Sequence, residues 1–218
     1  MKETVRTGHH SRPSTADRSA ENSRSGRRLP ETARRKFLKT TVLAGLVWPL
    51  IDEAFGNELP ATDERPQEGD RFVFAEGDRE GAEIKPGDLP LEGPQVLAWP
   101  KDPKANVVRN GSRLNQVLLL PLNPDSLDEQ TRPRAANGVV AYSAICTHAQ
   151  CPVTGWVEDE GRQVLKCFCH NSEYDPRQEA NVVFGPAPRH LAALPVKIDD
   201  GALVAAGTFL GRVGFRPS

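Results

Sequence analysis

Short apolar runs separated by turn-forming residues dominate the chain after residue 70. Most are four to nine residues long and rich in Val, Leu or Ile, with Gly, Pro, Asn or Asp between them. This pattern is typical of an antiparallel β fold. No stretch after residue 60 keeps a helical period for more than two turns, so we expect little helix. The predicted strands cover residues 71–75, 95–99, 114–122, 138–144, 163–167, 181–184, 194–198 and 203–206.

The first fifty residues follow a different pattern. Residues 1–30 are rich in Ser and Arg without apolar periodicity, which predicts a disordered N-terminus. The basic segment Arg34-Arg35-Lys36 then precedes the apolar run 41–51, the architecture of a signal peptide. Its paired arginines resemble a twin-arginine export signal. The run is shorter than the roughly 20 apolar residues that a membrane-spanning helix needs, so we expect a short apolar signal or anchor helix.

Small residues suggest where this signal or anchor segment ends. Ala54 and Gly56 occupy the two positions that a signal peptidase recognises, so we favour cleavage after Gly56 over retention as an uncleaved anchor. We therefore expect a signal or anchor segment over 1–56, an acidic linker over 57–70 and one domain over 71–218. The protein is predicted to be exported to the periplasm, either free or anchored at the periplasmic face of the inner membrane.

Charge is divided unevenly along the 218 residues. Residues 1–39 contain eleven Lys or Arg and four Asp or Glu, whereas the remainder contains 17 basic and 25 acidic residues. The acidic body argues against nucleic acid as a partner, because phosphates require a basic face. The 19 prolines and 18 glycines fit a turn-rich β domain.

All four cysteines lie between residues 146 and 169, in two segments that each offer one Cys and one His after a predicted strand. The spacings Cys-x-His and Cys-x-x-His let both side chains of a segment reach one metal centre. Two thiolates suit one iron of a [2Fe–2S] cluster, and two neutral imidazoles on the other iron raise the reduction potential. A zinc site would use the same four residues, and a disulfide framework would use the cysteines alone. The candidate ligands are Cys146, His148, Cys167 and His170.

The two segments, CTHAQC from residue 146 and CFCHNSEYD from residue 167, resemble the two sequence boxes of the Rieske family. The resemblance implies a Rieske-type antiparallel β-sandwich with a small cluster-binding subdomain at about 140–192. It implies one [2Fe–2S] cluster held by the four candidate ligands and a disulfide between Cys151 and Cys169. Hydroxyls of Ser172 and Tyr174 would donate hydrogen bonds to a bridging sulfide and a ligand sulfur, and residues 185–188 (GPAP) would cover the cluster. Zinc would leave these additional residues without a role.

The disulfide pair and the export signal together favour the high-potential, respiratory branch of the family. Oxygenase activity needs a separate mononuclear iron site, and only His9, His10 and His190 remain for it. The first two lie in the N-terminal tail, and we expect His190 to be solvated on a surface loop. Oxygenase activity is therefore not expected.

Two roles for such an electron carrier follow from the resemblance. In the first, the chain is the iron–sulfur subunit of a quinol–cytochrome c reductase, partnered by cytochrome b and cytochrome c, with His148 or His170 as the catalytic residue at ubiquinol. In the second, it is a non-catalytic relay: the small subunit of an exported molybdoenzyme of the arsenite-oxidase type, or a free periplasmic carrier. Ala149 and Gln150 replace the usual Leu-Gly pair of quinol-oxidising members and favour the relay. Asn171 and Phe168 also depart from the family pattern, which has Gly and Pro there.

Overall fold

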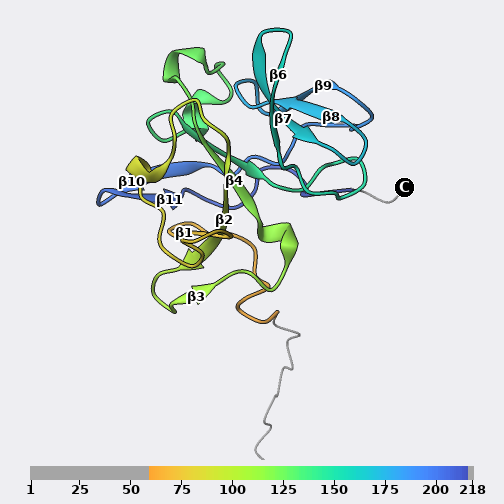
Figure 1. Cartoon of the computed structure of the whole chain (residues 1–218). Coiled ribbons are helices and arrows are strands. Elements are labelled where there is room, and N and C mark those ends of the chain that lie inside the picture. The colour runs from red at the N-terminus through yellow and green to blue at the C-terminus, as the bar shows by residue number, and fades with distance from the viewer. Residues whose placement is uncertain (1–58, 216–218) are drawn as a thin grey trace, which may run out of the picture. The chain divides into compact units, whose positions relative to one another are not determined.

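The computed structural model describes residues 59–215, and these form a mostly β protein (Figure 1). The predicted signal or anchor segment 1–56 lies outside the described residues. Within the described range no helix is long and apolar enough to cross a membrane. The strands are β1 Arg71–Phe74, β2 Val96–Asp102, β3 Val107–Val108, β4 Val117–Pro121, β5 Val139–Ser143, β6 Gly155–Asp159, β7 Arg162–Cys167, β8 Ser172–Asp175, β9 Asn181–Phe184, β10 Val196–Asp199 and β11 Ala202–Ala205.

The strands form two antiparallel sheets. The larger one has the order β10-β11-β1-β2-β4-β5, with β3 paired to β2. The smaller one runs β6-β7-β8-β9 and is inserted between β5 and β10 along the chain. In Figure 1 the smaller sheet, coloured teal to light blue, forms a lobe of its own beside the larger one. This insertion lies within residues 140–192, the range predicted for the cluster-binding subdomain, and it contains the second Cys/His segment.

Strands β4 and β5 divide the interior into two apolar cores. Side chains alternate between the faces of a strand, so Leu118 and Leu120 of β4 face one core while Val117 and Leu119 face the other. The first core also contains Leu165 and other side chains of the smaller sheet, and it therefore joins the two sheets. All five residues of β4 are buried, which explains why its sequence is a continuous apolar run rather than an alternating one.

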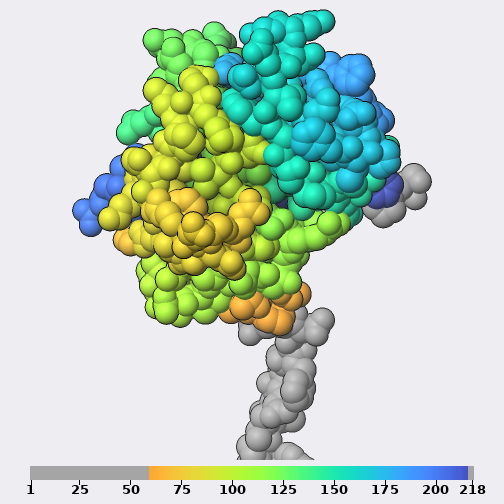
Figure 2. Space-filling model, in the orientation of Figure 1, coloured from red at the N-terminus to blue at the C-terminus, as the bar shows by residue number. Residues whose placement is uncertain are grey.

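Two hairpin turns follow from local sequence. Glu160-Gly161 joins β6 to β7 and Asp200-Gly201 joins β10 to β11, and all four residues have positive φ. A two-residue turn of this kind matches the twist of the strands and favours Gly at its second position. The teal segment around the β6–β7 turn projects from the surface in Figure 2.

The predicted mostly β fold is confirmed, and the predicted runs contain or overlap eight of the strands. The helical content of residues 59–215 is four short 3-10 helices, Pro86–Asp88, Arg113–Asn115, Pro124–Ser126 and Arg132–Arg134. Strands β3, β6 and β8 were not predicted. β8 consists of Ser-Glu-Tyr-Asp, a polar sequence that is buried along its whole length. It lacks the apolar pattern because its side chains form polar contacts inside the domain.

The described part of the acidic segment 57–70 packs against the larger sheet. The Arg109 guanidinium, which is 3% exposed, donates to Asp70 at 2.7 Å and to Glu64 at 2.5 Å. Burial opposes the charge of Arg109, but hydrogen bonds to the two carboxylates outweigh it and raise its pKa. Asn115 donates to the Glu64 carbonyl at 2.7 Å. These contacts extend the packed domain upstream of β1.

We predict that Asp70→Ala lowers the free energy of unfolding by about 3 kcal/mol, because it leaves the buried Arg109 charge without its main partner. Chemical denaturation monitored by circular dichroism measures this change. The matched control is Glu68→Gln, which removes an exposed pair with Lys197 and should leave the denaturation midpoint nearly unchanged. Equal midpoints for the two variants would contradict the structural role of the buried pair.

Candidate metal centre

Two loops present the predicted ligands. The first follows β5 and is closed by backbone hydrogen bonds from Cys146 N–H to the Cys151 carbonyl at 2.8 Å and from Gln150 N–H to the Cys146 carbonyl at 3.1 Å. The second is the connection between β7 and β8, whose end residues Cys167 and Ser172 are paired across the strands. Each loop is therefore held at its base by backbone hydrogen bonds, and its tip carries a His.

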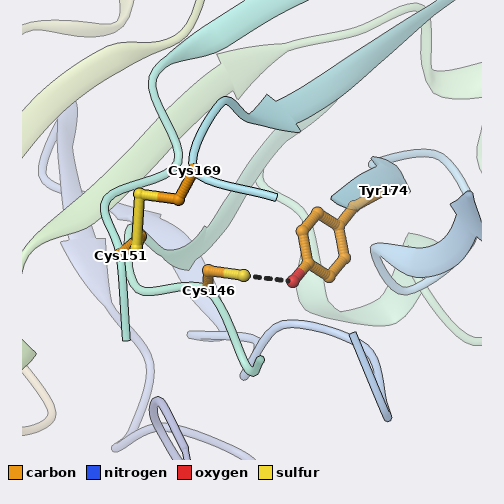
Figure 3. The surroundings of a disulfide bond; sticks show 4 residues. All are labelled: Cys146, Cys151, Cys169 and Tyr174. Atoms are coloured by element: carbon orange, nitrogen blue, oxygen red, sulfur yellow. Dashed lines mark hydrogen bonds between the residues drawn. A yellow bond between two sulfur atoms is a disulfide. The ribbon is translucent and has the colours of Figure 1, made fainter. Parts of the chain in front are cut away.

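A disulfide between Cys151 and Cys169 joins the two loops, as predicted, with Cα atoms 6.4 Å apart (Figure 3). The sulfurs of Cys151, Cys167 and Cys169 all lie within 4.8 Å of one another. The disulfide uses the sulfurs of Cys151 and Cys169. The other two cysteines of the chain, Cys146 and Cys167, are free thiols, and both are buried. The bridge thus separates the structural cysteines from the pair that can bind metal.

The imidazole rings of His148 and His170 lie edge to face, with their centroids 4.6 Å apart. His148 is half-buried and His170 is exposed. The Nδ1 atom of His148 is buried and has no hydrogen-bond partner among the described residues. A buried nitrogen without a partner suits a metal ligand, since coordination would satisfy it.

The environment of the thiol pair also suits a cation. Burial raises the pKa of the Cys167 thiol, and the nearby Cys146 raises it further, whereas the N–H groups of Cys169 and His170 lower it by hydrogen bonding. Two neighbouring thiolates repel each other in a buried site unless a metal neutralises their charge. Two buried thiols and two adjacent imidazoles therefore fit a [2Fe–2S] cluster with mixed ligands.

The two predicted hydroxyl donors are both buried beside this site. Tyr174 Oη lies 3.1 Å from Cys146 Sγ (Figure 3). Burial raises the pKa of Tyr174, so its hydroxyl keeps its proton and can donate a hydrogen bond to a thiolate. Ser172 Oγ accepts from the Ala187 N–H at 3.2 Å, and its own hydrogen remains available as a donor.

The segment 185–188 lies over the end of the second loop, as the hydrogen bond from the Ala187 N–H to Ser172 Oγ shows. Its first residue, Gly185, has φ +89°, and a Cβ atom there would come within 2.5 Å of the Asn171 carbonyl oxygen. Only glycine fits such a close approach of two backbones. Further along, the Arg189 carbonyl accepts from Thr147 Oγ1 at 2.6 Å, which ties this segment to the first loop as well.

The structure corrects the expectation that His190 is solvated. His190 is half-buried, and its Nδ1 atom is buried without a hydrogen-bond partner among residues 59–215. The neighbouring Leu191 is fully buried in the first core and draws His190 toward the interior. No charged or apolar pattern in the sequence indicated this position.

The sequence also did not indicate the contribution of the C-terminal segment, residues 208–215. The Arg189 guanidinium donates to the Arg212 carbonyl at 2.7 Å and to the Gly214 carbonyl. A Cβ atom on Gly214 would lie 3.0 Å from the Gln150 side chain. The C-terminal segment thus packs against the tip of the first loop.

Comparison with known proteins places this site in a family. Residues 122–195 match the model of the Rieske [2Fe-2S] domain. A candidate Rieske subunit of a respiratory nitrate reductase from Haloferax mediterranei is 32% identical over 84% of this chain and 80% of its own length. The cytochrome bc1 complex Rieske iron-sulfur subunit of Streptomyces coelicolor is 30% identical over 83% of this chain. The solved soluble domain of Rieske protein II from Sulfolobus acidocaldarius overlaps 44% of this chain and 65% of its own, with 22% identity and a TM-score of 0.34.

The fold and the donor set define a small β metalloprotein with a mixed thiol and imidazole site. The chain belongs to the Rieske iron–sulfur protein family, and its Rieske domain binds one [2Fe–2S] cluster. Such a cluster takes up and releases one electron at a time. The chain spans about half the length of the first curated relatives, 53% of the Streptomyces coelicolor protein and 58% of a subunit from Streptomyces lividans.

We predict that Tyr174→Phe lowers the reduction potential by about 50 mV, because a hydrogen bond worth about 1 kcal/mol no longer stabilises the extra electron. Protein-film voltammetry measures this shift. Tyr142→Phe is the matched control: its hydroxyl is equally buried but donates to the Pro176 carbonyl, away from the ligands. A shift of the same size in both variants would show that the hydroxyl of Tyr174 has no specific effect.

Removal of the disulfide should loosen both loops. We predict that Cys151→Ser lowers the free energy of unfolding by about 3 kcal/mol, as expected for a bridge that closes a loop of this length, and also lowers the reduction potential. The double variant Cys151→Ser/Cys169→Ser should match the single one, since the bond is lost only once. An unchanged potential in both would refute a role of the bridge in the electronic properties of the site.

Proposed function

We propose that Cys146 and Cys167 bind one iron of the cluster, that His148 and His170 bind the other, and that the protein transfers single electrons at its histidine edge. The observation that carries this proposal is the asymmetry of the site. Both thiols are buried, whereas His170 is exposed and His148 is half-buried. An electron can therefore enter or leave through the imidazoles without opening the fold.

The surrounding residues would tune and protect this site. Tyr174 and Ser172 supply hydroxyl donors that favour the reduced state, because they stabilise added negative charge. The disulfide and the segment 185–188 hold the two loops together and keep water from the thiol side. Tyr174 and Ser172 lie in strand β8, and the disulfide and the segment 185–188 belong to short, hydrogen-bonded connections, so little reorganisation would accompany electron transfer.

At the level of the whole enzyme, we propose that the chain is the iron–sulfur subunit of a quinol–cytochrome c reductase and takes electrons from ubiquinol. A ring nitrogen of His148 or His170 would accept a hydrogen bond from the quinol hydroxyl and take its proton as the electron leaves. The exposed ring of His170 and the similarity to Rieske subunits of cytochrome bc1 complexes support this role. Cytochrome b and cytochrome c would be the partners.

A second role has specific support, that of a relay subunit that contacts a molybdoenzyme rather than quinol. The tip beside His148 carries Ala149 and Gln150 instead of the large apolar side chain that would seal a quinone contact. This chain also matches a larger share of the nitrate reductase relative, 80% of its length, than of the cytochrome bc1 relative, 53% of its length. In either role we propose that residues 1–56 direct export by the twin-arginine route, to the periplasm or the periplasmic face of the inner membrane.

Deletion of the gene distinguishes the two roles. We predict that membranes of the deletion strain lose ubiquinol-dependent reduction of cytochrome c to background. The wild-type gene should restore this activity, whereas a Cys146→Ser variant should not. Electron paramagnetic resonance of the purified protein should show the rhombic spectrum of a reduced [2Fe–2S] cluster with histidine ligands.

Other results would contradict parts of the proposal. Intact quinol oxidation together with loss of a periplasmic molybdoenzyme activity would establish the relay role instead. Purification with zinc, or reduction without a rhombic spectrum, would overturn the proposed ligand assignment.

A further inference from the structure

Two adjoining hollows lie beside His148. The first, of about 490 Å³, is lined by Arg113, His148, Ala149, Gln150 and Phe215. The second, of about 290 Å³, shares Gln150 and Phe215 and extends along the C-terminal segment. It is lined in addition by Arg65, Arg212 and mostly small or apolar residues. Because they share lining residues, we treat them as one surface, the His148 groove, which starts at a predicted metal ligand and extends to the C-terminal segment.

The His148 groove contains positive charge and no carboxylate. Neither hollow is lined by Asp or Glu, although residues 40–218 carry eight more acidic than basic groups. Among the described residues most arginines form ion pairs, namely Arg71, Arg79, Arg109, Arg134, Arg162 and Arg177. The others are Arg65, Arg113, Arg132, Arg189 and Arg212, and all of these except Arg132 line the groove or bind the C-terminal segment.

Two of these arginines are fixed by neutral groups. Arg189 donates to two carbonyls of the C-terminal segment, and Arg65 donates to the Leu114 carbonyl and to Asn115 Oδ1. Burial lowers the pKa of Arg189, and the nearby Arg212 lowers it further. The local fold therefore concentrates like charges without compensating them, an arrangement that costs stability and is relieved by an external anion.

The other two arginines are available to a partner. The side chains of Arg113 and Arg212 are exposed and make no hydrogen bond within the described part of the chain. Phe215 lines one hollow with Arg113 and the other with Arg212, and it offers an apolar contact that is 42% exposed. A rim of exposed arginine around an exposed aromatic side chain is the composition that protein interfaces favour.

We propose that the His148 groove is the docking site for a redox protein with an acidic surface, which places carboxylates against Arg113 and Arg212 and packs on Phe215. Such a complex would bring the partner's redox centre next to the exposed imidazole edge. Opposite charges would also steer the two proteins together and raise the association rate at low salt. This inference rests on the electron-transfer function proposed above.

Two small oxidants of opposite charge test whether the positive charge of the His148 groove affects electron transfer. The full-length protein is reduced and then mixed in a stopped-flow instrument with hexacyanoferrate(III), a trivalent anion, or tris(phenanthroline)cobalt(III), a trivalent cation. At an ionic strength of about 10 mM, Arg113→Gln/Arg212→Gln should slow oxidation by the anion roughly tenfold and should not slow oxidation by the cation. The control Lys101→Gln/Lys104→Gln removes the same charge from the β2–β3 hairpin, outside both hollows, and should have a much smaller effect.

Two cytochromes c, one with an acidic and one with a basic surface, test the docking of a protein. At low salt the wild type should reduce the acidic cytochrome faster than the basic one, and this rate should fall as salt is added. The groove variant Arg113→Gln/Arg212→Gln should lose this salt dependence. Equal effects of the groove and control variants would overturn the proposal. An effect on hexacyanoferrate(III) alone would also overturn it, since the groove would then be a site for small anions only. If neither oxidant takes electrons from the wild type, the electron-transfer function itself fails.

Discussion

The metal site depends on one covalent constraint, the disulfide between Cys151 and Cys169. The proposed ligands come in two pairs from loops on different sheets, one after β5 and one between β7 and β8. Neither loop has regular structure at its tip, and each tip is exposed to solvent. The disulfide joins two cysteines that are 18 residues apart in the sequence, and it holds the two tips together. Because it uses two of the four cysteines, these two cannot bind metal. The two buried thiols that remain can face a common centre, while the imidazoles stay at the surface.

A second layer of contacts connects this site to the rest of the domain. Tyr174 contacts Cys146 and Thr147 in the first loop, and Thr147 donates to the backbone of Arg189. Arg189 in turn binds the C-terminal segment. Cys146, Cys167 and Tyr174 are members of the core that Leu118 and Leu120 of β4 help to form. The position of the proposed ligands is therefore determined by the packing of both sheets, and not by the loops alone.

The sequence predicted those features that depend on local pattern. Apolar runs located β4 and β5, because these strands are buried on both faces. The spacing of Cys and His indicated the candidate ligands for a similar reason, since one short loop must bring two side chains to one point. β8 was not predicted because its polar side chains are buried by contacts with other elements: Lys166 of the neighbouring strand β7 pairs with Glu173, and Cys146 of the first loop contacts Tyr174. The packing of the acidic segment 59–70 likewise depends on Arg109, which lies far away in the sequence.

The departures from the family pattern have a structural explanation at two positions. Gln150 and Asn171 both have positive φ, 58° and 60°, a conformation that glycine adopts without strain and that Asn tolerates better than Gln. Glycine at 150 would satisfy the backbone but would leave no side chain at the tip. Gln150 instead lines both hollows beside His148 and contacts Gly214 of the C-terminal segment. The strain at this position thus accompanies a surface that links the first loop to the C-terminal segment and its Arg212.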